Sequence, residues 1–253
     1  WFHAVIWPAV LIALDLPLPK CIYAHSFWIS EGKKMSKSLG NFIDLEAVES
    51  YIEKYNLDAW RYYLVTQGPL GATDADFVSD RFQDIYNAHL VNTVGNSTSR
   101  VTAMINKYFD GVVPSEMDGK TRIEISGFDW PAKCDAAFLA WEKAMEAFEL
   151  TKAIEEAMNL IRDVDLFIND TAPFTLAKDE SKQKELGAIL YQCIETLRIA
   201  TLLLSPVIPL KTKEFHDAIQ ANTCSGNVQE LVQWGGMKQG ATVRKVALFP
   251  RVV

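Results

Sequence analysis

A short basic segment, EGKKMSKSLGN over residues 31–41, has the residue types that bind phosphate. It contains three lysines and two serine hydroxyls, namely Lys33, Lys34, Lys37, Ser36 and Ser38. A mobile ammonium group can follow negative charge as it builds up on a phosphate, which is electrostatic stabilisation of a transition state. Glycines near both ends give the backbone freedom to turn. Lysines in such a loop are more often solvated surface, so the prediction of a phosphate site depends on the flanking elements.

The flanking segments predict how this loop is held. Residues 21–30, CIYAHSFWIS, alternate well enough to predict a β-strand before it. Residues 44–56 predict a helix after it, with Asp44 capping the exposed amides. Residues 58–66 predict a second helix, and the Gly, Pro and Asp content of residues 67–76 predicts a loop. The basic segment thus lies in a strand–loop–helix context.

The chain changes character after residue 76, and an all-α bundle is predicted from there on. Residues 77–109 place apolar side chains at three- and four-residue steps, which predicts one long amphipathic helix. Residues 111–131 predict a loop. Three further helices and a closing extended strap are expected over residues 136–162, 181–204, 211–221 and 243–253, respectively. In the N-terminal part, the apolar run of residues 4–14 predicts a helix around Pro8.

The composition is that of an ordinary soluble globular protein. The 253 residues are 49% hydrophobic and carry a net charge of −7. Because the chain as a whole is acidic, any contact with nucleic acid is expected from a local basic face. The apolar run of residues 4–14 is shorter than the ~20 residues of a membrane span. A cytoplasmic location without a membrane partner is therefore expected.

The cysteines and histidines do not form a pattern of metal ligands. Cys21, Cys134, Cys193 and Cys224 are widely scattered, and neither a CxxC pattern nor a histidine at ligand spacing occurs. We therefore expect no zinc site and no disulfide scaffold within the chain, only reduced, buried thiols. His89 and His216 are expected to be ordinary residues on helix faces.

The letters KMSKS, residues 34–38, match the signature loop of class I aminoacyl-tRNA synthetases. The flanking segments narrow this resemblance to methionyl-tRNA synthetases: FHAVIWPAVLIALDLPLP, IYAHSFWISEGKKMSKSLGNFIDL, LDAWRYYL, NTVGNSTSR, TAPFTLAKD and LFPR. The resemblance implies a mainly α chain. Residues 1–76 would be the remnant of a Rossmann-type α/β catalytic domain with the signature loop. Residues 77–253 would be the α-helical anticodon-binding bundle with its strap.

The resemblance also implies roles for residues of the catalytic part. Lys37 would bind ATP and Lys34 would assist. The other residues implied at the nucleotide are Met35, Ser36, Ser38 and His25. The implied methionine pocket includes Phe2, His3 and Trp7, and aromatic walls suit a thioether. Ser26 stands where the family usually has glycine.

In the bundle, the resemblance implies an anticodon-binding role for three residues. Asn96 and Arg100 are four residues apart and so share one helix face, from which both can hydrogen-bond to a base edge. Phe174 stands where the family usually has a tryptophan that stacks on an anticodon base, and a phenyl ring keeps a π-face for stacking.

The implied reaction is ligation of methionine to its tRNA. Methionine would be activated with ATP and Mg²⁺ and then transferred to a methionine-specific tRNA. The chain lacks the His-Ile-Gly-His motif and the connective insert of the family, and it starts without Met in buried-type sequence. We therefore expect a C-terminal half that is inactive in adenylation by itself. Two alternatives stay open: a non-catalytic tRNA-binding module, and a class I synthetase for cysteine, leucine, isoleucine or valine.

Overall fold

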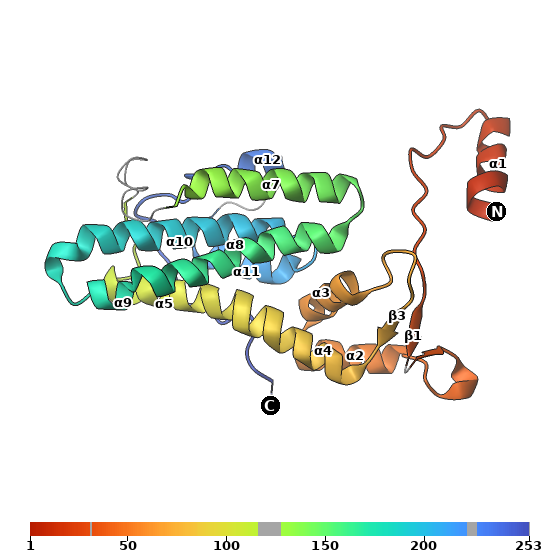
Figure 1. Ribbon diagram of the computed structural model, residues 1–253, viewed down its shortest axis with the longest axis horizontal. Coiled ribbons are helices and arrows are strands. Elements are labelled where there is room, and N and C mark those ends of the chain that lie inside the picture. Colours follow the sequence, from red (N-terminus) through yellow and green to blue (C-terminus); the bar gives the residue numbers. More distant parts are fainter. Residues whose placement is uncertain (31, 116–127, 222–226, 253) are drawn as a thin grey trace. The chain divides into compact units, whose positions relative to one another are not determined.

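The computed structural model describes residues 1–30, 32–115, 128–221 and 227–252 (Figure 1). The chain forms two compact units, residues 1–42 with 68–77 and residues 43–67 with 78–253, and each is described by itself. The division predicted after residue 76 differs from this packing over residues 43–67, which pack with the helical unit. As a division of functions, the predicted boundary stays a prediction.

The first unit starts with an apolar helix. A π-helical turn, η1 (Phe2–Ile6), continues into α1 (Trp7–Ala13), which confirms the helix predicted around Pro8. Pro8 stands at the junction of the two, in the first turn of α1.

The sheet of the first unit has three short strands in the order β2-β1-β3. The central strand β1 (Trp28–Ser30) pairs antiparallel with β2 (Lys33–Lys34) and parallel with β3 (Ala75–Phe77). The strand predicted over residues 21–30 is therefore correct only at its end. Upstream, the Ser26 amide bonds to loop carbonyls, so no ladder forms there. β3 was missed because it exists only through its pairing with β1.

The second unit starts with two helices, which confirm both predictions for this segment. In α2 (Leu45–Tyr55), the carboxylate of Asp44 accepts a hydrogen bond from the Ala47 amide at 2.9 Å. This is the expected N-cap. The next helix, α3 (Leu57–Gln67), starts directly after Asn56.

A continuous helical stretch follows, as predicted, but its middle is π-helical. It consists of α4 (Ser79–Ile85), η3 (Tyr86–Gly95) and α5 (Asn96–Tyr108). Segments of π-helix usually have a local cause, and the closing strap lies against this one. The Tyr86 hydroxyl donates to the Pro250 carbonyl at 2.7 Å, and a Cβ at Gly95 would lie 3.2 Å from the Phe249 carbonyl oxygen.

The single helix predicted over residues 136–162 is wrong. The structure has two helices, α7 (Trp130–Glu146) and α8 (Leu150–Thr171), which pack against each other (Figure 1). Phe148, with φ of +59°, breaks the helix between them. The loop predicted over residues 111–131 ends before α7, and its residues 116–127 lie outside the described part of the chain.

The bundle is completed around one buried helix. After α9 (Pro173–Leu176) and the short turn η4 (Glu180–Lys182), α10 (Gln183–Leu203) is buried along nearly its whole length and packs on α5, α7 and α8. By length and composition, residues 180–203 could cross a membrane, but the most apolar 18-residue stretch of this segment is wholly buried among its neighbours, as in a core helix. Two short helices follow, α11 (Pro209–Ala218) and α12 (Val228–Leu231).

The cysteine positions correct one prediction. Cys134 and Cys193 are buried as predicted, and burial raises the pKa of the Cys134 thiol to about 12. Cys21, however, is exposed, and Cys224 lies outside the described residues. His216 lies on a helix face, as predicted, and this is the face of α11 that is buried in the core.

Candidate functional site

The basic loop leaves the sheet through one glycine and ends at another. Gly32, with φ of +71°, turns the chain from β1 into β2, which is the pair Lys33–Lys34. A single turn of 3-10 helix, η2 (Lys37–Leu39), follows, and Gly40 ends it with φ of +66°. Both positions use the left-handed region that glycine adopts without strain. The loop therefore presents its lysines on short, exposed elements.

The groups predicted to bind ATP are close together in this loop. The hydroxyl oxygens of Ser36 and Ser38 lie 2.7 Å apart, so they hydrogen-bond to each other. The ammonium group of Lys37 is exposed and lies 6.0 Å from the centre of the Phe42 ring. A cavity of about 360 Å³ opens beside the loop, and its lining consists of Phe27, Trp28, Ile29, Lys34, Met35 and Asp74.

His25 lies in the extended chain just before β1, and an unpredicted carboxylate holds this segment. The His25 side chain is exposed. Its Nδ1 lies 2.8 Å from the carbonyl oxygen of the next residue, Ser26, so the ring is turned toward the adjacent backbone. Asp74 accepts hydrogen bonds from the Ser26 hydroxyl and, at 3.0 Å, from the Phe27 amide. These two bonds hold the pKa of Asp74 below its usual value. The hydroxyl of Ser26, where glycine was expected, thus has a structural role.

The residues predicted to form the methionine pocket lie on one face of the N-terminal helix. Phe2, His3 and Trp7 share this face with Ile6 and Val10, at helical spacing. Phe2 is 71% exposed and Trp7 is 46% exposed. The residues that the structure describes thus supply one wall of a pocket.

The predicted anticodon residues lie on α5 and α9. Asn96 is exposed, and the guanidinium of Arg100 donates to the Asn169 side-chain oxygen on α8 at 3.2 and 3.3 Å. Phe174 is 49% exposed and follows a turn at Ala172, which has φ of +45°. Asn169 is in the last turn of α8, so this helix end joins the surroundings of Arg100 to the turn that carries Phe174.

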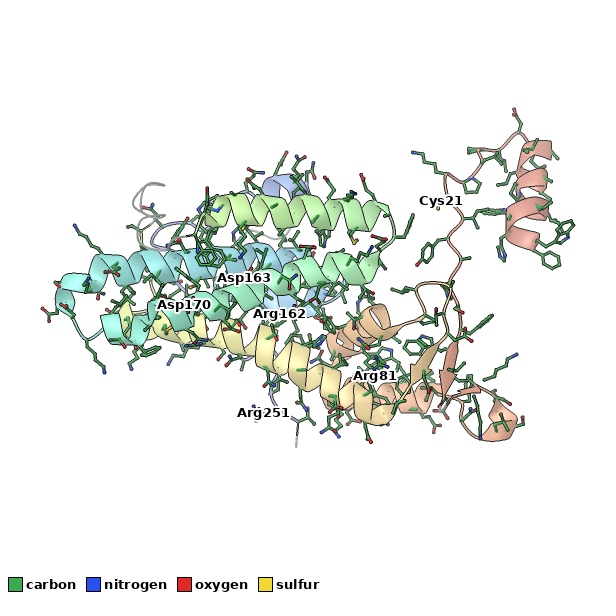
Figure 2. The ribbon with its side chains drawn as sticks, in the orientation of Figure 1. Cys21, Arg81, Arg162, Asp163, Asp170 and Arg251 are labelled. Carbon is green, nitrogen blue, oxygen red and sulfur yellow. The ribbon has the colours of Figure 1, made fainter. Side chains whose placement is uncertain are left out.

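A half-buried carboxylate next to Arg100 was not predicted. Asp165 on α8 accepts a hydrogen bond from the Ser97 hydroxyl at 2.6 Å. Burial raises the pKa of Asp165, and the Ser97 hydroxyl and the Arg100 charge oppose that shift. Asp165 lies on α8 between Arg162 and Asp170, which are labelled in Figure 2. No sequence spacing could have revealed Asp165 and Asn169, because their partners are more than sixty residues away on another helix.

Comparison with known proteins gives consistent matches. Residues 1–102 match the family model described as tRNA synthetases class I (M). The chain is 37% identical to a methionine–tRNA ligase of Caldanaerobacter subterraneus subsp. tengcongensis and 36% identical to that of Bacillus subtilis, over 99% of its own length in both. It spans only 38% and 37% of these relatives, respectively.

The solved structures give the same picture for the fold. Mycobacterium tuberculosis methionyl-tRNA synthetase in complex with methionyl-adenylate superposes with a TM-score of 0.84 at 28% sequence identity. The superposition covers 99% of this chain and 48% of that one. The free form of the same synthetase superposes with a TM-score of 0.82 at 25% identity.

Proposed function

Because this chain belongs to the class I methionyl-tRNA synthetase family, we propose that it supplies the ATP loop and the anticodon-binding bundle of a methionine–tRNA ligase. The reaction is activation of methionine by MgATP to methionyl-adenylate, followed by transfer to the tRNA. We also propose that the ligase is cytoplasmic. The observation that carries it is the exposed KMSKS loop, which stands between the sheet and α2 in a chain matched along 99% of its length.

In this proposal, Lys37 stabilises the charge that builds up on the phosphates of ATP during adenylate formation. Lys34 assists from β2. Ser36 and Ser38 exchange their mutual hydrogen bond for contacts with phosphate oxygens. Met35 lines the adjoining cavity and anchors the loop, and His25 lies near the nucleotide. Magnesium enters with ATP as part of the substrate.

Methionine and tRNA are bound by the other two groups of residues. Phe2, His3 and Trp7 form an apolar wall for the methionine side chain, whose polarisable sulfur packs well against aromatic rings. Asn96 and Arg100 hydrogen-bond to anticodon base edges, and Phe174 stacks on a base. The contact with Asn169 already orients the Arg100 guanidinium before tRNA arrives.

The test is amino-acid-dependent exchange between ATP and pyrophosphate by a complete ligase that contains this chain. Methionine is expected to support exchange, while cysteine, leucine, isoleucine and valine are not. Exchange driven by one of those four amino acids would assign the chain to a different class I synthetase. Binding of tRNA with no amino-acid-dependent exchange would instead support the non-catalytic module.

A further inference from the structure

We propose that Asn41 is a positioning residue for the ATP loop, because its side-chain amide ties the loop to both strands that carry it. This inference rests on the proposed function of the loop. Asn41 lies outside the KMSKS letters and would not touch ATP in this role. It would set the backbone from which Lys34 and Lys37 reach the phosphates.

The amide of Asn41 makes three contacts with three separate points of the backbone. Its Oδ1 accepts a hydrogen bond from the Ser36 N–H at 2.9 Å. Its Nδ2 donates to the carbonyl oxygens of Ser30 at 3.4 Å and Lys34 at 3.3 Å. One side chain thereby joins the end of β1, the end of β2 and the residue before η2. It uses both the acceptor oxygen and the two donor hydrogens of its carboxamide.

The rest of the loop has little to fix its conformation. β2 is two residues long, and η2 has no side-chain cap. The Ser36 and Ser38 hydroxyls bond to each other and not to the backbone. Gly40, directly before Asn41, adopts the left-handed backbone conformation, and a glycine restricts the chain less than any other residue. Among the described residues of the loop, the contacts of Asn41 therefore define where the chain returns.

A second side chain holds the opposite end. The Asp76 carboxylate on β3 accepts a hydrogen bond from the Gly32 N–H at 2.9 Å. Asp76 thus fixes where the chain leaves β1, while Asn41 fixes where it comes back. Lys34 and Lys37 lie in the segment between these two held points, Gly32 and Asn41. A charge-stabilising group works only when it is held close to its productive geometry, so loosening one anchor lowers the rate of the chemical step.

The structural half of the proposal is tested on this chain by hydrogen exchange of the Ser36 amide, measured by NMR. Asn41→Ala is expected to accelerate that exchange about fivefold, the order of one lost hydrogen bond. Asn41→Asp keeps the acceptor but loses both donors, so its rate is expected between those of wild type and Asn41→Ala. The matched control is Asn227→Ala, which removes a side-chain acceptor of the Gln229 amide in the helical unit. Equal Ser36 exchange in Asn41→Ala and wild type would overturn the proposal.

The functional half uses a complete ligase that contains this chain. Asn41→Ala is expected to lower kcat for methionine-dependent ATP–pyrophosphate exchange about tenfold, with the KM for methionine unchanged, and Asn41→Asp to recover part of the loss. Lys37→Ala is measured alongside. If Lys37→Ala leaves the exchange intact, the proposed function of the loop fails. If Lys37→Ala slows the exchange but Asn41→Ala does not, the proposed function stands and the positioning role fails.

Discussion

At the scale of single residues, the loop combines a backbone held by hydrogen bonds with the exposed ammonium group of Lys37. Lys37 stands on one turn of 3-10 helix, and among the described residues its exposed ammonium group has a distant contact with the Phe42 ring. It can leave that contact at little cost, because an exposed cation–π pair at 6.0 Å is weak. The backbone next to Lys37 is held by the side chain of Asn41, which accepts a hydrogen bond from the Ser36 N–H. This arrangement suits a group that must meet charge only as the charge develops.

For Lys37→Ala in a complete ligase, we expect adenylate formation to slow by roughly 10²–10³-fold, the scale for one lost charge-stabilising donor. The dissociation constant of methionine should change far less, because the loop acts on phosphate. Pre-steady-state measurement of adenylate formation checks this, with Lys54→Ala on α2 as a control for the loss of a surface lysine. An unchanged adenylation rate in the Lys37 variant would show that the loop is not the catalytic element.

Of the residues predicted to bind the anticodon, Arg100 has a side-chain contact in the described structure. Its guanidinium is oriented by Asn169 and lies in the field of the Asp165 carboxylate. An arginine held in this way loses less side-chain entropy when it binds a base than a free one does. If Arg100 binds an anticodon base as proposed, this orientation lowers the entropy cost of that contact.

For Arg100→Ala, we expect kcat/KM for methionine tRNA to fall by about one to two orders of magnitude, from about 1–3 kcal/mol per base contact. Methionine activation without tRNA should stay near normal. The measurement compares aminoacylation of matched and anticodon-swapped tRNAs at fixed ionic strength, since phosphate contacts depend on salt. Lys107→Ala on the same helix is the control. A variant that kept the full wild-type ratio between the two tRNAs would make Arg100 an ordinary surface residue.

If Phe174 stacks on an anticodon base, its substitution should change the affinity for tRNA. Phe174→Trp enlarges an exposed ring at the start of α9, so tRNA affinity should be equal or tighter, because a larger π-face stacks over more area. Phe174→Ala should weaken binding by about 1–3 kcal/mol. Titration of the tRNA at constant salt measures both. Equal affinities for the alanine variant and wild type would exclude stacking at this position.

At the scale of elements, α10 holds the C-terminal segment through a buried ion pair. Glu195 and Arg198 are both buried and lie 2.7 Å apart. The Glu195 carboxylate also accepts three backbone amides, those of Gly235, Gly236 and Met237, at 2.8–3.0 Å. The Arg198 guanidinium donates to two carbonyls of the same segment. Every charge is compensated, so α10 and the segment from residue 231 to 237 form one cooperative piece.

Removing one partner of this pair should be costly. For Glu195→Ala we expect the free energy of unfolding to fall by about 3–5 kcal/mol, because Arg198 would remain buried without its counter-charge. Glu185→Ala on the same helix breaks an exposed pair with Lys182 and should cost at most about 1 kcal/mol. Denaturant titrations of both variants give the comparison. A loss below 1 kcal/mol for Glu195→Ala would contradict the role of the pair.

His216 on α11 makes the stability of the bundle depend on pH. Burial, reinforced by the Arg198 charge, lowers its pKa from 6.5 to about 4. Between these values the unfolded chain binds more protons than the folded one, so stability should rise with pH from about 4 to 6.5. The expected loss on acidification is about 3 kcal/mol. Unfolding titrations of wild type and His216→Phe should differ in slope over this range, and identical slopes would contradict a buried neutral histidine.

At the scale of the whole molecule, the two units differ in how they place their apolar residues. The helical unit buries its apolar side chains in a continuous core built around α10. In the first unit, large apolar side chains remain exposed among the described residues, including Trp1, Phe2, Trp7, Ile12, Leu14 and Phe27. Of these residues, Phe2 and Trp7 lie together on one helix face with Ile6 and Val10.

We expect this chain by itself not to activate methionine. Phe2, His3 and Trp7 are exposed on one helix face, and the sequence has no His-Ile-Gly-His motif to hold the phosphates. Methionine-dependent ATP–pyrophosphate exchange by the isolated chain is the measurement, with a complete ligase of the family as positive control. Robust exchange by the chain alone would overturn the expectation. Binding of tRNA by the helical unit is compatible with it.

The sequence by itself determined the features that depend on near neighbours in the chain. The lysines and glycines of the basic loop, the Asp44 cap of α2 and the long helix over residues 79–108 follow from local chemistry and spacing. Such features need no partner far along the chain. They were enough to indicate a phosphate-binding loop followed by a helical bundle.

Only the tertiary structure decided features that need a partner from elsewhere. β3 exists because it pairs with β1, and η3 is π-helical where the closing strap packs on it. His216 was predicted on a helix face, but only its contacts with Thr201 and the Arg198 carbonyl of α10 show that this face is the buried one. Asn169 contacts Arg100 because folding brings two helices together across sixty-nine residues of sequence. The physical reason is that a side-chain amide bonds to whatever group the fold places within about 3 Å, and spacing in the chain does not encode that placement.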